Sequence, residues 1–135
     1  MISIRLFILN SKGKLLLQKT KDGLQIPQMD CTFIEGCTSL EDMAFLKLSS
    51  FFGITDIHPK DLRLYSFSNK IQDNELFLDM SFTGHTRSRR VELTDYKFME
   101  LREIKKVVNL FKDKIDERMI RRFIIREEDP TICQG

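Results

Sequence analysis

The opening segment, residues 1–20, constrains the fold most, because it contains the period-two pattern of a strand, a break and a second strand. Within ISIRLFIL at residues 2–9, every second residue is a large aliphatic one, which directs those side chains to one face of a sheet. Residues 10–14, NSKGK, supply turn residues, and LLLQKT at 15–20 returns as the partner strand. The chain is therefore expected to begin with a β-hairpin that starts a sheet.

The strongest helix signal covers residues 39–52. Thr38 and Glu41 fit a capping box at its start, and Gly53 is suited to its end. Large apolar residues occupy nearly the whole circumference of this helix, including Leu46 and Phe51. We therefore expect its exposed face to be covered, either by collapse of the neighbouring loops or by another subunit.

Further strands and helices are expected downstream. The expected strands are 62–69, 75–84 and 91–100, and the expected helices are 101–111 and a last one from residue 115. The first two of these strands are separated by the turn-like residues 70–74. Asp116 can cap the last helix, and the tail at residues 127–135 is expected to be loose.

Length and composition favour one globular domain over residues 1–135. Of the 135 residues, 41% are hydrophobic, which suits a single core. The formal net charge is +2, so the overall charge demands neither a nucleic acid nor an acidic membrane as partner. The first apolar run is interrupted by Arg5 and then by residues 10–14, which argues against a secretory signal or a spanning helix. We expect a cytoplasmic protein that does not engage a membrane.

The cysteines predict neither a disulfide framework nor a metal site. There are three, Cys31, Cys37 and Cys133, and no two of them form a CxxC pair. An odd number fits free thiols in a reducing compartment. The two histidines, His58 and His85, are not at ligand spacing from a cysteine, which disfavours zinc.

The order of these elements resembles that of the Nudix hydrolase (MutT-like) family over nearly the whole chain. Three stretches carry the resemblance: GKLLLQKTKDGLQIP at 13–27, EGCTSLEDMAFLKLSSFFGI at 35–54 and YKFMELREI at 96–104. The resemblance implies an α/β fold of the α+β kind, the Nudix α/β/α sandwich with a mixed sheet.

The second stretch resembles the Nudix box but departs from it where the family has its chemistry. The family's box reads G-x5-E-x7-R-E-U-x-E-E-x-G-U, in which the glutamates ligate Mg²⁺ and the arginine orients them. The degenerate positions, aligned on Gly53 and Ile54, are Thr38 and Lys47 for glutamates, Leu46 for the arginine, and Ser50 and Phe51 for the glutamate pair, with Gly36 kept in the approach loop. Because Mg²⁺ needs hard oxygen ligands, the resemblance implies that the usual metal site is lost.

Hydrolase activity would require that acidic residues outside the box replace the lost glutamates as metal ligands. The candidates are Glu35, Glu41, Asp42, Glu75, Asp79, Glu92, Glu100 and Glu103. Glu41 and Asp42 are better explained by the first turn of the helix, where carboxylates offset the helix dipole. Glu100 and Glu103 fit solvated helix-surface charges. No residue is therefore assigned as catalytic.

Four basic residues are candidate ligand-binding residues. Lys19 matches a strand position where the family often places a cation near the substrate's phosphates. Arg87, Arg89 and Arg90 lie in one expected loop, HTRSRR, and guanidinium groups suit phosphate. The alternative for all four is an ordinary solvated surface charge.

These observations leave three hypotheses about function. The leading one is a pseudoenzyme with the Nudix fold that binds a nucleotide-like small molecule or a protein partner, with a homodimer as one form of the latter. The alternative is a divergent Nudix hydrolase of nucleoside diphosphate-linked substrates, which alone would require Mg²⁺. The third is a small RNA-binding domain that uses the HTRSRR loop, although the net charge disfavours a nucleic-acid partner.

Overall fold

The computed structural model describes residues 1–31 and 37–128. The strands are β1 (Ile2–Asn10), β2 (Lys14–Thr20), β3 (Gly23–Gln25), β4 (Gln28–Cys31), β5 (Arg63–Gln72), β6 (Glu75–Thr86) and β7 (Tyr96–Glu100). The helices are α1 (Leu40–Ser50), α2 (Leu101–Lys106) and α3 (Lys114–Glu128), with 3-10 turns η1 (Pro59–Asp61) and η2 (Val108–Leu110). None of the helices in these two ranges is both long enough and apolar enough to cross a membrane.

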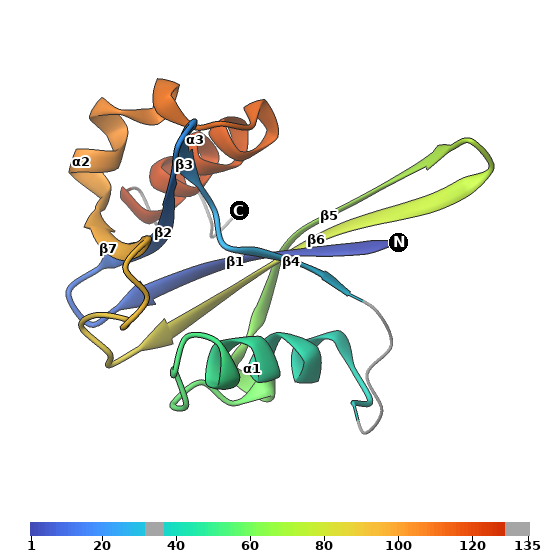
Figure 1. Cartoon of the computed structure of the whole chain (residues 1–135), viewed down its shortest axis with the longest axis horizontal. Helices are drawn as coiled ribbons and strands as arrows, with labels where there is room; N and C mark the ends of the chain where they lie inside the picture. Colours follow the sequence, from blue (N-terminus) through green and yellow to red (C-terminus); the bar gives the residue numbers. More distant parts are fainter. Residues whose placement is uncertain (32–36, 129–135) are drawn as a thin grey trace.

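The strands form one mixed sheet in the order β3-β2-β1-β6-β5. β1 and β6 run parallel, whereas the other pairs are antiparallel. Outside this order, β4 pairs with β1 and β7 pairs with β2. Figure 1 shows α1 on one side of this sheet and α2 and α3 on the other. The expected α+β fold with a mixed sheet is confirmed.

β1 supplies both hydrophobic cores of the molecule. Ile4, Leu6 and Ile8 pack toward α1, whereas Phe7 and Leu9 pack toward α2 and α3. Such burial on both faces is typical of a strand in the middle of a sheet with helices on either side. The aliphatic residues at alternate positions therefore fill only one of the two cores.

The start of α1 differs by one residue from the expected capping box. Ser39 is the N-cap, and its side chain accepts a hydrogen bond from the backbone N–H of Asp42. The Asp42 carboxylate accepts hydrogen bonds from the backbone and side chain of Thr38, which lower its pKa. At the other end, Gly53 has φ +71°, which favours glycine, and the Ile54 N–H donates to the Leu48 carbonyl.

The second strand pair is longer than expected. β5 continues through Lys70, Ile71 and Gln72, and the turn consists only of Asp73 and Asn74, with φ of 52° and 64°. Two such residues form the tight turn whose twist matches that of paired strands. The β5–β6 hairpin consequently extends away from the helices (Figure 1).

The last helix begins earlier than expected, and Asp116 does not cap it. The Asp113 carboxylate accepts from the Ile115 N–H at the helix start, whereas Asp116 is fully buried and bonded to Arg5 at 2.7 Å. The end of the chain was also only partly expected, because residues 127 and 128 belong to α3 rather than to a loose tail. The remainder of that tail, with Cys133, lies outside the described residues.

Candidate functional site

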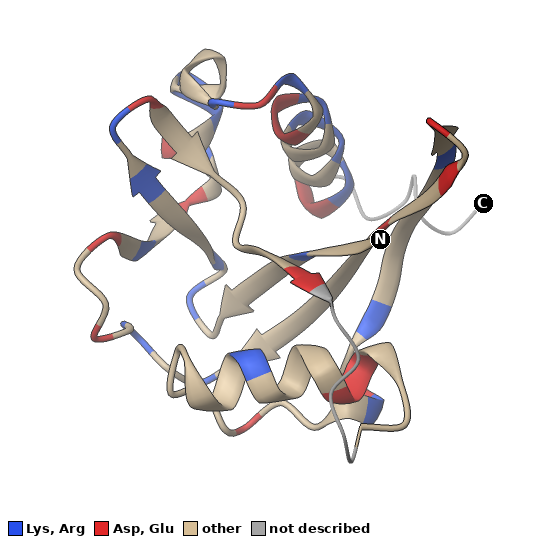
Figure 2. Cartoon of the chain, turned by 45° about the vertical axis from the view of Figure 1, so that its right-hand side comes forward, with Lys and Arg blue, Asp and Glu red and all other residues tan. Residues whose placement is uncertain are grey.

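Three of the degenerate box positions, Leu46, Lys47 and Ser50, lie on α1, Phe51 is its C-cap, and Thr38 precedes its N-cap. Leu46 and Phe51 are 39% and 42% exposed. The Lys47 ammonium lies 3.8 Å from the centre of the Phe51 ring, and the Ser50 hydroxyl donates to the Leu46 carbonyl. Figure 2 shows that α1 carries little charge along its length. Within residues 1–31 and 37–128, no loop covers Leu46 and Phe51, so the expected collapse is wrong for these two side chains. Cover by another subunit stays a prediction.

This side of α1 does not fit a divalent metal ion. Its four altered positions present an aliphatic side chain, an ammonium, a hydroxyl already bonded to the backbone, and a phenyl ring. Mg²⁺ prefers carboxylate, carbonyl and water oxygens. Within residues 1–31 and 37–128, no three His, Cys, Asp or Glu residues are grouped so that they could hold a metal ion. Glu35 and Gly36 lie outside these ranges.

An aromatic cluster continues from the end of α1 to β7. The ring of Phe51 meets those of Phe52 and Tyr96 edge-on, with centroids 4.9 and 5.9 Å away, and Phe52 and Tyr96 are 4.9 Å apart. Partial burial and the neighbouring charge of Asp95 raise the pKa of Tyr96, so its hydroxyl stays protonated at neutral pH.

A hollow of ≈ 670 Å³, which we call the α1 hollow, lies against this cluster. Its lining residues are Ser50, Phe51, Phe52, Gly53, Arg90, Val91, Glu92 and Leu93. The hollow combines an aromatic surface with one guanidinium and one carboxylate. Such a combination suits a small molecule that has a planar ring, hydroxyl groups and negative charge.

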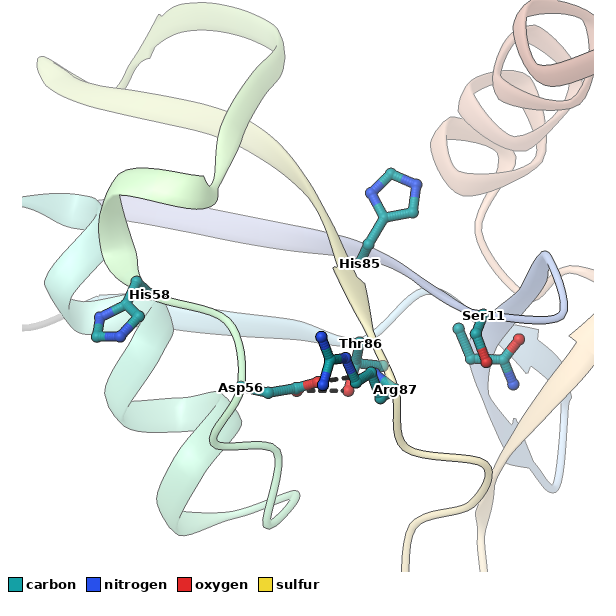
Figure 3. A pocket seen from close by; sticks show the side chains of 7 residues that line it. Ser11, Asp56, His58, His85, Thr86 and Arg87 are labelled. Carbon is teal, nitrogen blue, oxygen red and sulfur yellow. Dashed lines mark hydrogen bonds between the residues drawn. The ribbon is translucent and has the colours of Figure 1, made fainter.

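A second, polar hollow of ≈ 510 Å³ lies where β1 and β6 end (Figure 3). The Asp56 carboxylate accepts from the Thr86 hydroxyl at 2.6 Å and from the Arg87 N–H at 2.7 Å. Partial burial opposes ionisation, but these hydrogen bonds outweigh it, and the pKa of Asp56 lies below its ordinary value. Its hydrogen bonds tie the loop before η1 to the end of β6.

The two histidines of this polar hollow do not form a reactive pair. His58 stacks on Phe45 of α1, with centroids 6.4 Å apart and rings 5° from parallel. His85 points in another direction, and neither ring is directed at Asp56 (Figure 3). The arrangement therefore lacks the mutual hydrogen bonds of a general acid–base dyad.

The three loop arginines do not gather at one site. Arg87 lines the polar hollow and Arg90 the α1 hollow, whereas Arg89 lines a third one with Asn10, Lys12, Lys14 and Glu100. The HTRSRR segment is also only partly a connection, because His85 and Thr86 belong to β6 and Thr86 is buried. A phosphate in the α1 hollow would meet only one of the three arginines.

Lys19 lies beside Lys97 of β7, a residue that no motif in the sequence marks. A hydrogen bond with Lys19 and the positive charge of Lys19 lower the pKa of Lys97. The negative charge of Glu103 in α2 raises that pKa, but by less. Residues 15 and 17 of the same strand pack toward α2 and α3. The strand alternation places Lys19 on that side of the sheet, opposite α1 and its hollow.

Comparison with known proteins supports the fold and goes no further. No protein-family model matches the sequence, and no curated protein matches it. Among solved structures, the MutT protein from Methanosarcina mazei Go1 is 18% identical, with 96% of this chain and 95% of that chain covered and a TM-score of 0.64. A Nudix hydrolase from Nitrosomonas europaea is 14% identical, with 90% and 86% covered and a TM-score of 0.61.

A third similar structure is the Nudix domain of Shewanella oneidensis NrtR, solved in complex with ADP-ribose. It is 13% identical, with 78% of this chain and 76% of that chain covered and a TM-score of 0.55. At such identities the likeness concerns the fold alone. The chain therefore has the Nudix fold, as the resemblance in sequence implied.

Proposed function

We propose that this protein is a non-catalytic Nudix-fold module that binds a nucleotide-like anionic ligand in the α1 hollow. The observation that carries the proposal is the position of the Lys47 ammonium, 3.8 Å from the centre of the Phe51 ring, on the helix side where the family has its glutamates. A cation at this place repels a metal ion, and neither residue offers an oxygen ligand. Without the metal, the usual activation of water at a diphosphate bond is lost.

The same side chains support ligand binding. Phe51 offers a partly exposed ring on which a base can pack, and Arg90 in the hollow can neutralise phosphate. The Lys47 ammonium does not line the hollow but adds positive charge beside it, next to the Phe51 ring. Glu92 also lines the hollow, and its carboxylate can accept hydrogen bonds from ribose hydroxyls or an amino group. The NrtR Nudix domain complexed with ADP-ribose supports the choice of ADP-ribose as a probe, by analogy of fold.

Calorimetric titration of the full chain with ADP-ribose tests the proposal. We expect binding of the same strength with Mg²⁺ and with a chelator, because no metal bridges ligand and protein. Replacement of Phe51 by alanine should weaken binding about tenfold or more, the effect of losing one stacked ring. Phe45→Ala is the matched control, because Phe45 lies on the same helix but stacks on His58 outside the hollow.

The alternative, a divergent hydrolase, predicts a different outcome. A panel of nucleoside diphosphate derivatives incubated with Mg²⁺ or Mn²⁺ should release neither phosphate nor monophosphate if the proposal holds. Metal-dependent release would refute it and would direct attention to acids outside the box, Glu35 among them. Absence of ADP-ribose binding together with a bound protein at the Phe51 face would favour the protein-interaction form of the hypothesis.

A further inference from the structure

The projecting β5–β6 hairpin has an uncovered apolar face. This face is continuous with the side of the sheet on which α1 packs. Its large apolar side chains and their exposed fractions are Leu64 (54%), Phe67 (52%), Ile71 (76%) and Leu76 (50%). The even-numbered residues of β6 direct their side chains to this face, as Phe82 shows by packing in the core beneath α1. Leu76 is one of them, and the three β5 residues are paired with even-numbered residues of β6. Four large apolar residues on one short ribbon form a patch that monomers seldom leave in water.

β5 is also an open edge of the sheet. Within the described part of the chain it pairs only with β6. Gln72 and Glu75 close the two-residue turn, so Gln72, Lys70 and Ser68 direct their backbone groups toward β6. Phe67, Asn69 and Ile71 therefore direct theirs outward. An unpaired edge of this length is a template for another strand.

The two ends of the hairpin differ in net charge. Lys60, Asp61 and Arg63 lie at its base, a net positive charge, and Lys70, Asp73 and Glu75 lie toward its tip, a net negative charge. Figure 2 shows basic colour near the base of this ribbon and both acidic and basic colour toward its end, where Lys70 precedes the turn. An antiparallel copy of the same hairpin would bring each acidic tip beside a basic base. This complementarity favours a second copy of the chain over an unrelated strand.

We propose that two copies of this chain pair through β5, antiparallel and about a two-fold axis at Asn69. In this register, Phe67 lies opposite Ile71 of the partner subunit, on the apolar face, and the symmetry repeats that contact. Arg63 approaches Asp73 and Glu75 of the partner subunit. Lys70 lies opposite Ser68 of the partner subunit, so the two lysines are diagonal neighbours rather than directly opposed. The pairing joins the two sheets and satisfies both edges, independently of any ligand in the α1 hollow.

Sedimentation velocity of the full chain at low and high protein concentration tests this assembly. We expect a concentration-dependent dimer whose dissociation constant rises about tenfold or more in Ile71→Lys, because that change places a charge in the apolar contact. The matched control is Ile125→Lys, which alters an equally apolar and 54% exposed residue on α3. It should leave the dimer unchanged. Circular dichroism verifies that both variants are folded.

Two further variants separate edge pairing from general stickiness. Asn69→Pro removes an outward N–H without touching a bond to β6, and should yield monomers. Glu75→Arg should weaken the dimer, and the double change Arg63→Glu with Glu75→Arg should restore it. A monomeric wild type at every concentration would overturn the proposal. So would protection of the outward amides of Phe67, Asn69 and Ile71 from hydrogen exchange that is the same at all concentrations, because it would mean that the chain covers its own edge.

Discussion

Arg5 is a cation in the middle of the sheet, only 5% exposed, and its surroundings explain how the fold tolerates it. Its Nε donates to the buried Asp116 carboxylate at 2.7 Å, while Asp113 and Asp79 lie 3.6 and 3.8 Å from its other nitrogens. The second Asp116 oxygen accepts from the Ile26 N–H at 3.1 Å. Burial raises the pKa of Asp116, and the contacts with Arg5 and Ile26 oppose that effect. The pair joins β1 to α3.

Removal of Asp116 should therefore be costly. In Asp116→Ala we expect the free energy of unfolding to fall by about 3 kcal/mol, because a buried guanidinium loses its main partner and a backbone N–H its acceptor. Glu117→Ala is the control, since Glu117 forms only an exposed pair with Arg121 and should cost about 0.5 kcal/mol or less. Urea denaturation measures both. Equal losses in the two variants would contradict the role of the buried pair.

At the scale of elements, the start of α1 shows how a helix selects its cap. Both Thr38 and Ser39 are residue types that cap helices, and only their hydrogen bonds distinguish them. Ser39 accepts from the Asp42 N–H at 3.1 Å, whereas the Thr38 hydroxyl donates to the Asp42 side chain at 2.9 Å. The sequence alone favoured Thr38 because Glu41 stands three residues later.

Two alanine variants distinguish these roles. Ser39→Ala should lower the free energy of unfolding by about 1 kcal/mol, since it deprives a helix N–H of its acceptor. Thr38→Ala should cost less, because the backbone N–H of residue 38 still donates to Asp42. Thermal or chemical denaturation of both variants gives the comparison. A larger loss for Thr38→Ala would restore the first assignment of the cap.

On the scale of the whole molecule, three neighbouring arginines serve three separate surfaces. Because only Arg90 lines the α1 hollow, Arg90→Ala should weaken ADP-ribose binding and reduce its dependence on salt as much as replacement of all three. Arg87→Ala and Arg89→Ala are the matched controls, and calorimetry at two salt concentrations is the measurement. Additive losses from the three single changes would show that the loop acts as one site.

How far the sequence predicts the fold depends on how local each signal is. The first hairpin and α1 were predicted because periodicity, a cap and Gly53 lie within a few residues of one another. β4 was missed, because its residues QMDC carry no strand pattern and pair with β1 over Ile2–Arg5. The expected turn at residues 70–74 was too long, since residues 70–72 are mostly polar and all exposed although they belong to β5.

The composition of the box positions on α1 was determined by the sequence alone, whereas residues 90–93 join them in the α1 hollow only through the tertiary structure. Leu46, Lys47, Ser50 and Phe51 occupy the box positions whatever surrounds them, and helical spacing makes Lys47 and Phe51 neighbours. The chemistry available on that side of α1 could therefore be read from the order of residues, because it depends on one helix.

Only the tertiary structure decided which distant residues meet. It paired Arg5 with Asp116, placed Lys97 beside Lys19 on the side of the sheet opposite α1, separated the three arginines, and left the apolar face of β5 uncovered. Each of these results depends on strand order and on which face of the sheet a side chain occupies. Those properties arise when segments far apart in the chain pack together, and no local pattern of residues specifies them.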